Sequence, residues 1–450
     1  MNENNLDLTT GSPLAKIIRF SLPLVGGSIF QQLYNFIDTM IVGRLLGIDA
    51  LAAVGAYYPL SFLVLGFIQG SCVGFSIPLA QSVGANEDRN SRQYLGNAIW
   101  LCIIIAAILT PVMMIFAGNI LAVLNTPHEI MKLATIFTVV SFAGIPANIL
   151  YNYSANALRA FGDSTRPFYF LIGSLVLNII LALIFIEEFH TGIAGVAFAT
   201  VISEFVSGLL NIWWMVYSGR FIRISLADTK FSLHHFNRMC IIGFPMGFEY
   251  SISAIGAVIM QDAINLLGTA AVAGQSAGEK IRQLFTLPME SVGMAIATYM
   301  AQNYGARKID RIKKGIIQGS LIQLTYSFLA FIVVMVFKKT LIAAVLGTTT
   351  GTVYDRADQY LTIISFFFII HGLLMIFRNT LQGLGHSIYA IFSGFGELIG
   401  RSFGGVLSIT SMGYIAICYS NQIAWGLSLL YCVLIMWRLF KRDEQLKVNK

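Results

Sequence analysis

The sequence predicts an all-α membrane protein of twelve transmembrane helices, arranged as two pseudo-symmetric lobes of six helices each. Of its 450 residues, 56% are hydrophobic and 11% are charged, whereas an average soluble chain carries about 25% charged residues. The apolar residues lie in blocks long enough to cross a hydrocarbon core of about 30 Å as helices. Several local patterns also recur after about 221 residues, which is the weak self-similarity that internal structural repeats leave.

Twelve apolar blocks have the length of a membrane span. Because lipid-facing helices are apolar nearly all round, Gly, Pro and charged residues indicate their limits better than helical periodicity does. Gly66, Gly70 and Gly74 in the second block form a seam of small residues that predicts close helix packing. In chain order, we expect helices at residues 14–42, 51–80, 93–117, 130–158, 167–186, 192–217, 239–267, 278–301, 315–337, 357–381, 388–408 and 414–437.

The Lys and Arg residues predict the orientation. Twenty of the 29 lie in the termini and the even-numbered loops, and the odd-numbered loops hold Arg44, Lys132, Lys338, Lys339 and Arg356. Cytoplasmic loops are enriched in Lys and Arg, so we expect a multi-pass protein of the bacterial inner (plasma) membrane with both termini in the cytoplasm. The basic residues form short runs and no single basic face, which argues against nucleic acid as a partner.

The internal repeat relates the two halves of the chain. With a shift of about 221 residues, Pro23 meets Pro245, and Ala80-Gln81 meets Ala301-Gln302. The further matches are Leu46-Gly47 with Leu267-Gly268, Gly84-Ala85 with Gly305-Ala306, and Asn156-Ala-Leu158 with Asn379-Thr-Leu381. Six helices per half is an even number, so the halves are parallel repeats about an axis along the membrane normal. We expect a first lobe at residues 1–217, a cytoplasmic linker at 218–238 and a second lobe at 239–450.

Two polar stripes mark the first half, because residues three or four apart share one helix face. The expected first helix carries Gln31, Tyr34, Asn35 and Asp38 in such a stripe. The fourth helix carries Asn148, Asn152, Asn156 and Arg159. Ionisable groups inside a membrane are costly, so the first stripe is expected to face a cavity, where a cation or a proton would neutralise Asp38. The amide stripe is explained equally well as hydrogen bonds that only hold helices together.

The second half also carries ionisable residues inside expected spans. Glu249 lies on the seventh helix, and His371 and Arg378 lie two turns apart on the tenth. For each of them an internal ion pair competes equally with a functional role. For Glu397 and Arg401, spaced i and i+4 on the eleventh helix, we favour a structural ion pair. One face of the eighth helix contains Glu279, Gln283, Thr286 and Glu290.

The sequence lacks the motifs of enzymes and of ATP-driven proteins. It contains no HExxH, no Walker loop and no GxGxxG followed by an acid, and its five cysteines lack metal-binding spacing. The motif Gly274-Gln-Ser276-Ala-Gly278 is similar to a nucleophile elbow, but an elbow follows a strand, and this motif is expected to join two membrane helices. We therefore expect neither an enzyme nor a cofactor.

A set of short motifs occurs in a specific order along nearly the whole chain. The set comprises Asp38-Thr39 followed by Gly43, Ala80-Gln81-Ser82-Val83-Gly84-Ala85 with its echo at 301–306, Arg159-Ala-Phe-Gly-Asp163, Asn178, and Gly195-Val-Ala-Phe-Ala-Thr200. In this order and spacing, the motifs resemble those of the multidrug and toxic compound extrusion (MATE) family of cation-coupled antiporters. The resemblance implies a V-shaped pair of six-helix bundles that exports organic, usually cationic, compounds in exchange for Na⁺ or H⁺.

The resemblance also implies an ion-coupling site in the first lobe. Many family members carry an Asp-Pro pair where this chain has Ala182-Leu183, so one expected carboxylate is missing. Our hypothesis is that Glu204, one turn after Thr200, replaces it. In the second lobe His371 stands where some Na⁺-coupled members have an Asp, which favours protons over Na⁺ there. The implied ion-coupling residues, which would also hold Na⁺ if Na⁺ is the coupling ion, are Asp38, Asn178 and Thr200.

Acidic groups and amides beside aromatic rings would bind a flat organic cation by charge and cation–π contacts. The expected partners are small organic cations and membrane lipid, and we expect a monomer. An alternative function is a lipid-linked saccharide flippase of similar two-lobe plan, which predicts a strongly basic cavity. A channel is disfavoured because the sequence has no repeated pore loop. The candidate substrate-binding residues are Gln31, Tyr34, Asn35, Asn152, Glu249, Gln283, Glu290, His371 and Arg378.

Overall fold

The computed structural model describes residues 7–218 and 225–448, without the side chains of residue 226 and of residues 443–448. The described residues form helices joined by short connections and contain no β-strand. In chain order the α-helices are α1 (Pro13–Leu45), α2 (Ile48–Gly84), α3 (Asp88–Val123), α4 (His128–Ala143), α5 (Ile145–Ala160), α6 (Thr165–Glu187), α7 (Ile193–Tyr217), α8 (Leu233–Asn265), α9 (Thr269–Gly305), α10 (Ile309–Leu346), α11 (Thr352–Phe366), α12 (Phe368–Gly383), α13 (Ser387–Leu407) and α14 (Tyr414–Val448).

The fourteen α-helices correspond to the twelve expected helices when each of two bent pairs is counted as one. α4 and α5 meet at 46°, and α11 and α12 meet at 51°. By length and composition, eight single helices qualify as membrane spans, or up to ten spans if each bent pair is one. The remaining two, α9 and α13, are long enough, but each contains an ion pair, Glu279 with Arg282 and Glu397 with Arg401. The expected order of helices is confirmed, whereas the prediction of unbroken fourth and tenth helices is wrong.

The ion pair in α9 also explains one wrong boundary and the misplaced motif. We expected the eighth span to begin at residue 278, but α9 begins nine residues earlier, at Thr269. Charged residues at this end lower the local hydropathy, although in the folded chain they are paired inside the protein. The motif at residues 274–278 therefore lies within α9, where no strand precedes Ser276, and it does not join two helices as expected.

The two helix breaks occupy equivalent positions in the repeat. Gly144 and Phe367 are as far apart in sequence as Asn156 and Asn379. The first break has a local signal, because Pro146 favours a new helix start. The second has no nearby proline or glycine signal; there, a tertiary contact supports the break, since Ser327 donates a hydrogen bond to the Phe368 carbonyl at 3.2 Å.

The repeat is visible in the backbone of the two halves. α1 and α8 have 33 residues each, and α2 and α9 have 37 residues each. Directly before α2 and α9, Gly47 and Gly268 adopt φ values of 87° and 92°, a region that favours glycine. The matched Leu-Gly pairs of the sequence therefore make the same turn twice.

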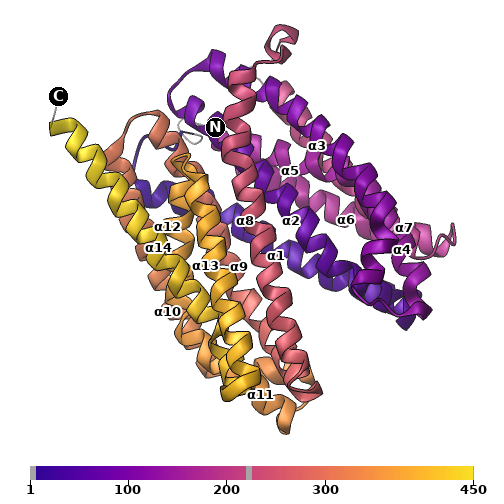
Figure 1. The fold of residues 1–450 in the computed structure, drawn as a ribbon. Helices are drawn as coiled ribbons and strands as arrows, with labels where there is room; N and C mark the ends of the chain where they lie inside the picture. Colours follow the sequence, from indigo (N-terminus) through magenta and orange to yellow (C-terminus); the bar gives the residue numbers. More distant parts are fainter. Residues whose placement is uncertain (1–6, 219–224, 449–450) are drawn as a thin grey trace.

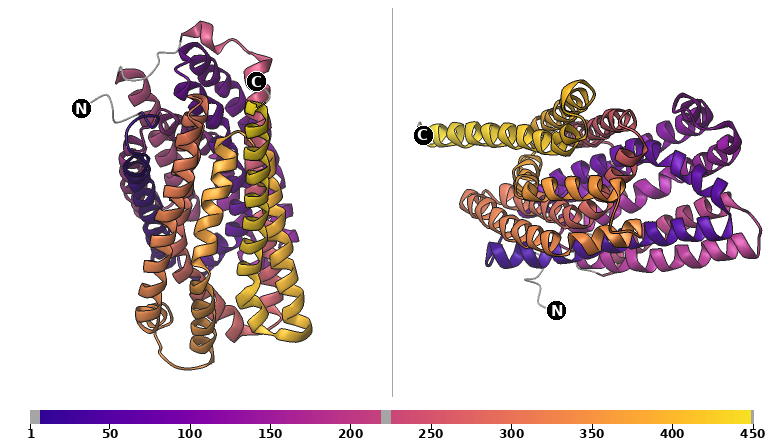
Figure 2. Two further views of the ribbon diagram at one scale, coloured as in Figure 1. Left: turned by 90° about the vertical axis from the view of Figure 1, so that its left-hand side faces the viewer. Right: turned by 90° about the horizontal axis from the view of Figure 1, so that it is seen from below.

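The two sets of helices form two lobes that diverge from one end of the molecule (Figure 1). We call α1–α7 the first lobe and α8–α14 the second lobe, and Figure 2 shows most of each set gathered on its own side. The end from which they diverge carries the short helix η2 (Leu226–Thr229) and the C-terminal end of α14; we call it the linker side. The lobe boundaries at 1–217, 218–238 and 239–450 stay predictions, and residues 219–224 of the linker lie outside the described residues.

The lobes touch where α2 packs against α8. A Cβ atom added to Gly70 would lie 2.7 Å from the carbonyl oxygen of Met246, and one added to Gly74 would overlap the Cα of Gly243. Gly66 also faces α8, at Tyr250. Backbones can approach this closely only where side chains are missing, so the predicted glycine seam is confirmed.

The Ala-Gln motifs of the repeat meet at the linker-side end of this interface. Gln81 of the first lobe donates to the Gly383 carbonyl of the second at 3.0 Å, and Gln302 of the second donates to the Ala160 carbonyl of the first at 2.7 Å. Any side chain at Gly84 would overlap the backbone of Gln302, and the equivalent Gly305 is in the same position against Gln81. The interface between the lobes thus contains two equivalent contacts, which are related by the pseudo-symmetry of the repeat.

The chain segments on the linker side cross between the lobes. Residues 7–12 precede α1 but dock on the second lobe: Leu8 is 1% exposed, and Arg311 donates to the carbonyls of Leu8, Thr10 and Gly11. The linker instead docks on the first lobe, where Trp100 of α3 donates to the Thr229 carbonyl at 2.8 Å. In the linker, the pKa of Asp228 lies below its ordinary value because the Ser225 backbone N–H donates to the carboxylate.

We predict that Gly74→Leu lowers the thermal stability of the detergent-purified protein, because the new side chain would push α8 away from α2. Overpacking of this kind costs about 1–3 kcal/mol. The control is Gly55→Leu in the same helix, since an added Cβ at Gly55 meets no atom of the described structure within 4 Å. Thermal unfolding of both variants is followed by tryptophan fluorescence. Equal melting temperatures would contradict the close packing of α2 against α8 at Gly74.

Candidate functional site

A cavity of about 200 Å³ lies inside the first lobe. It is lined by residues of α1, α2, α5, α6 and α7, and Met294 of α9 adds one wall from the second lobe. Among the lining residues, Glu204 and Arg159 carry charge, and the polar ones include Gln31, Gln69 and the three amides Asn148, Asn152 and Asn156. The cavity is therefore polar, with one carboxylate and one guanidinium.

A continuous amide ladder runs along α5 between these two charges. Asn148 donates to the Glu204 carboxylate at 3.0 Å, and Asn152 donates back to the Asn148 side-chain oxygen at 3.1 Å. Asn156 continues the ladder through the Asn152 carbonyl at 2.8 Å, and Arg159 donates to the Asn156 side chain at 3.1 Å. The predicted stripe is thus a hydrogen-bonded chain that ends on the carboxylate, which the sequence did not show.

Asp38 lies near a second polar group formed by α1, α6 and α7. Asn178 donates to the Thr200 hydroxyl at 3.0 Å, and the Tyr34 hydroxyl lies 3.3 Å from the same oxygen. Within the described chain, Oδ1 of Asp38 and Oδ1 of Asn178 are both buried without a hydrogen-bond partner. Such orphaned acceptors are uncommon in proteins and carry a desolvation cost, so this group is suited to receive a proton or a cation.

Small residues bring these helices together. Gly27 of α1 packs on Leu171 of α6, and Gly208 of α7 leaves room for Leu150 of α5. At the break before α5, a side chain on Gly144 would overlap Val201 of α7. Because a glycine lies at each of these contacts, the helices α5 and α7 approach closely. This approach brings Glu204 within hydrogen-bonding distance of Asn148.

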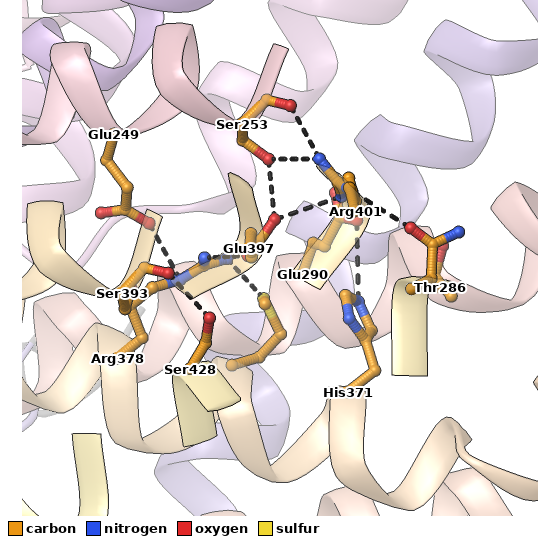
Figure 3. A network of polar contacts seen from close by, with 12 residues as sticks. Glu249, Ser253, Thr286, Glu290, His371, Arg378, Ser393, Glu397, Arg401 and Ser428 are labelled. Atoms are coloured by element: carbon orange, nitrogen blue, oxygen red, sulfur yellow. Dashed lines mark hydrogen bonds and ion pairs between the residues drawn. The ribbon is translucent and has the colours of Figure 1, made fainter. Parts of the chain in front are cut away.

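The second lobe contains a buried charge network (Figure 3). Arg378 bridges two carboxylates, with its Nε 3.0 Å from Glu249 and its Nη1 2.7 Å from Glu397. Arg401 approaches the other oxygen of Glu397 at 3.2 Å and donates to the Ser253 carbonyl at 2.7 Å. The Glu397–Arg401 pair predicted from sequence is confirmed as an ion pair, and it is one part of this larger network.

The network continues through α14 to the start of α9. Asn421 accepts from Arg401 at 3.1 Å and donates to Glu279 at 3.3 Å, and Glu279 pairs with Arg282 at 2.6 Å. Tyr360 donates to the same carboxylate at 2.6 Å. Three carboxylates and three guanidinium groups therefore balance one another in this network, and we call it the second-lobe charge network.

Three predicted residues of the second lobe lie outside this network. His371 is 5% exposed, lies against Trp425 with the ring centroids 4.5 Å apart and the ring planes tilted by 45°, and approaches Glu290 no closer than 3.8 Å. The Glu290 side chain is 47% exposed. Gln283 is exposed and has no hydrogen bond to the residues that the structure describes. The stripe on α9 predicted from sequence therefore divides into a paired end at Glu279 and a more open end at Glu290.

The structure thus brings the candidate residues together in two separate groups. Gln31, Asn152 and Glu204 line the first-lobe cavity, and Tyr34, Asn178 and Thr200 form the group next to it. Asn35 is exposed, and its side chain makes no hydrogen bond within the described chain. Glu249 and Arg378 are partners of each other. Tyr151, which the sequence suggested as an aromatic neighbour for a bound cation, lines the cavity. Sequence reasoning did not select Gln382, which donates to Glu249 at 2.8 Å.

The fold and its polar interior define a multi-pass membrane transporter built from two lobes of six helices. A family model described as MatE matches residues 23–184 and 245–400, and the chain belongs to this family, as the sequence motifs predicted. The curated relatives include two proteins of Bacillus subtilis, the probable multidrug resistance proteins YoeA (27% identical, covering 91% of this chain and 90% of YoeA) and YpnP (26% identical, covering 84% of each). A solved structure titled as an outward-facing multidrug resistance MATE family transporter superposes with a TM-score of 0.88 at 22% identity, covering 97% of this chain and 99% of that one.

We predict that Glu397→Gln destabilises the protein, because two buried guanidinium groups each lose their shared carboxylate. Breaking a buried ion pair costs about 3–5 kcal/mol. Glu290→Gln is the matched control, since its side chain is half exposed and lies 3.8 Å from the ring of His371. Thermal unfolding in detergent should separate the two variants; a Glu397→Gln melting temperature equal to that of Glu290→Gln would show that the network contributes little.

Proposed function

We propose that this protein is a secondary active antiporter that exports organic compounds, organic cations among them, across the bacterial inner membrane in exchange for H⁺ or Na⁺. In this proposal it acts as a monomer surrounded by lipid, with both termini and the linker side in the cytoplasm. The observation that carries the proposal is the polar first-lobe cavity, with Glu204 at one end of the amide ladder, together with the unpartnered Oδ1 atoms of Asp38 and Asn178 in the same lobe.

The charges of the cavity favour export of organic compounds over flipping of a lipid-linked saccharide. A flippase for an anionic lipid carrier needs a strongly basic cavity. Here the lining holds one carboxylate, Glu204, for one guanidinium, Arg159, and the remaining polar groups are amides, hydroxyls and Gln side chains. Tyr151 and Phe168 supply ring faces in the same wall, which suits a cation with a flat apolar body.

The cavity is too small for a large substrate in this conformation. Pockets for drug-sized ligands measure about 300–1,000 Å³, and this one measures about 200 Å³. Helix α1 controls both its size and the contact between lobes, because Pro23 and Gln31 line the cavity while Ser28 contacts Ser291 of α9 at 2.7 Å. We infer that a displacement of α1 enlarges or empties the cavity and releases the second lobe in the same step.

The hydrogen bonds around Thr200 support a proton as the coupling ion. A hydroxyl donates once and accepts twice. Thr200 donates to the Val196 carbonyl, accepts from Asn178, and lies within reach of the Tyr34 hydroxyl, so its oxygen is fully used. Oδ1 of Asp38 and Oδ1 of Asn178 are left as buried acceptors without a hydrogen bond in the described group. A proton needs one carboxylate oxygen, whereas a hard cation needs a shell of several oxygens.

We predict that purified protein in liposomes moves a fluorescent organic cation under an imposed pH gradient, and that Asp38→Asn abolishes this movement because the variant cannot take up the coupling proton. Asp49→Asn, an exposed first-lobe position outside the cavity, is the control and should transport normally. Transport under a Na⁺ gradient alone would contradict the proton. Transport under neither gradient would contradict antiport and lead to a test with a lipid-linked saccharide.

Glu204→Gln tests whether this residue replaces the carboxylate missing at Ala182. We expect coupled transport to fall about tenfold, because the hydrogen bond from Asn148 to a charged acceptor, which contributes about 1.5–3 kcal/mol, becomes a neutral one. The pH dependence of transport should change as well. Glu187→Gln, at the exposed end of α6, is the matched control. If Glu204→Gln transports with an unchanged ion dependence, Glu204 has no part in coupling.

A further inference from the structure

A second and larger pocket lies between the lobes on the linker side, outside the proposed transport cavity. It measures about 630 Å³, which is within the range of small-molecule sites. The first lobe contributes Gln81, Ser82 and the start of α3, and the second lobe contributes the starts of α8 and α10 and the end of α14. We call it the seam pocket, because Gln81 and Gly305, which make the contact between lobes, are part of its wall.

The seam pocket is strongly basic. Its lining includes Arg238, Arg307, Lys313 and His234 and one carboxylate, Glu87. That carboxylate already accepts a hydrogen bond from Asn90 at 2.6 Å. Arg238 donates to Gln81 at 3.1 Å, which leaves most of its guanidinium donors available. All four basic side chains come from the second half of the chain, as two pairs about 70 residues apart in sequence that folding brings to one pocket.

Arg307 has a backbone conformation that its side chain does not favour. Its φ is 57°, in the left-handed region, where the equivalent first-half residue is Asn86 with φ 55°. Asn tolerates this region well, whereas a longer residue is uncommon there. The Arg307 side chain is exposed and makes no hydrogen bond or ion pair within the described chain. The turn itself does not need an arginine, because Asn86 makes the same turn in the first half. Arg307 therefore adds a positive charge to the pocket at some conformational cost.

We propose that the seam pocket binds a phosphate group, either the headgroup of an anionic phospholipid or a soluble phosphate compound. Guanidinium groups bind phosphate oxygens with paired hydrogen bonds, and basic pockets between membrane helices on the cytoplasmic side are known sites of lipid headgroups. Pro78, Ile309 and Phe440 give the pocket an apolar wall, which a lipid would cover with its glycerol and first methylenes.

Binding at this pocket favours the conformation in which the lobes touch. The walls from the first lobe and from the second lobe are adjacent only while Gln81 contacts the Gly383 carbonyl and Gln302 contacts the Ala160 carbonyl. A ligand that binds one conformation better than another shifts the population toward it. The phosphate group therefore acts as a regulator that holds the linker side closed, separate from the substrate and the coupling ion.

The test is direct binding, which does not depend on the proposed transport function. Full-length protein in neutral detergent is incubated with phosphatidylglycerol or with phosphatidylcholine of the same acyl chains, and retained lipid is counted by native mass spectrometry. A second arm measures the melting temperature with and without inorganic pyrophosphate. The variant is Arg307→Asn with Lys313→Gln, and the control is Arg89→Gln with Lys314→Gln, which removes the same charge from exposed positions on the same side outside the pocket.

We expect phosphatidylglycerol to bind at least about tenfold more tightly than phosphatidylcholine, and the pocket variant to lose about fivefold for each charge removed, the order of attraction of one basic residue for an anionic lipid. The control should bind as the wild type does. Stabilisation by pyrophosphate that the pocket variant lacks, without lipid preference, would support the site with a soluble phosphate as its ligand. The proposal would be overturned if the variant and the control lost lipid binding equally. It would also be overturned if the protein neither preferred phosphatidylglycerol nor was stabilised by pyrophosphate.

Discussion

The close contact between the lobes on the linker side is the constraint on which the rest of the structure depends. Gly84 lies against the backbone of Gln302 and Gly305 against that of Gln81, so backbone meets backbone with no side chain between them. In lipid, close packing and hydrogen bonds drive helix association, because apolar burial gives no advantage between helices that are surrounded by hydrocarbon. The glycines allow the approach, and the two Gln side chains supply the hydrogen bonds. This contact fixes which end is closed and where the lobes diverge.

The two lobes use polar groups in opposite ways. In the second lobe, Arg378, Glu397 and Arg401 satisfy one another, and a buried network of paired charges resists rearrangement because any separation leaves uncompensated charge. In the first lobe, Asp38 and Asn178 each retain a buried acceptor without a partner in the described chain. A buried carboxylate oxygen without a hydrogen bond changes its energy when a proton or a cation arrives, so we propose that Asp38 places the conformational change in the first lobe.

The repeat preserves the backbone while the chemistry of equivalent positions has diverged. Asn148 and His371 are related by the spacing that relates Asn156 to Asn379, and each follows a helix break by a few residues. Asn148 donates to Glu204, whereas His371 contacts the Trp425 ring and approaches Glu290 at 3.8 Å. The two halves therefore share a similar backbone. Different side chains give the first lobe a candidate binding cavity and the second lobe a network of paired charges.

The sequence by itself determined the membrane class, the order of helices, the repeat, the glycine seam and the family, because these depend on apolar length, residue spacing and local motifs. It also selected the amide stripe and Asp38, since a polar face on an apolar helix must be buried in protein. Only the tertiary structure decided which groups meet: that Asn148 reaches Glu204, that Arg378 bridges Glu249 and Glu397, and that α11 and α12 are separate helices. Such contacts join residues far apart in sequence, and the free energy of a buried charge depends on the partner that folding brings to it, which local spacing does not encode.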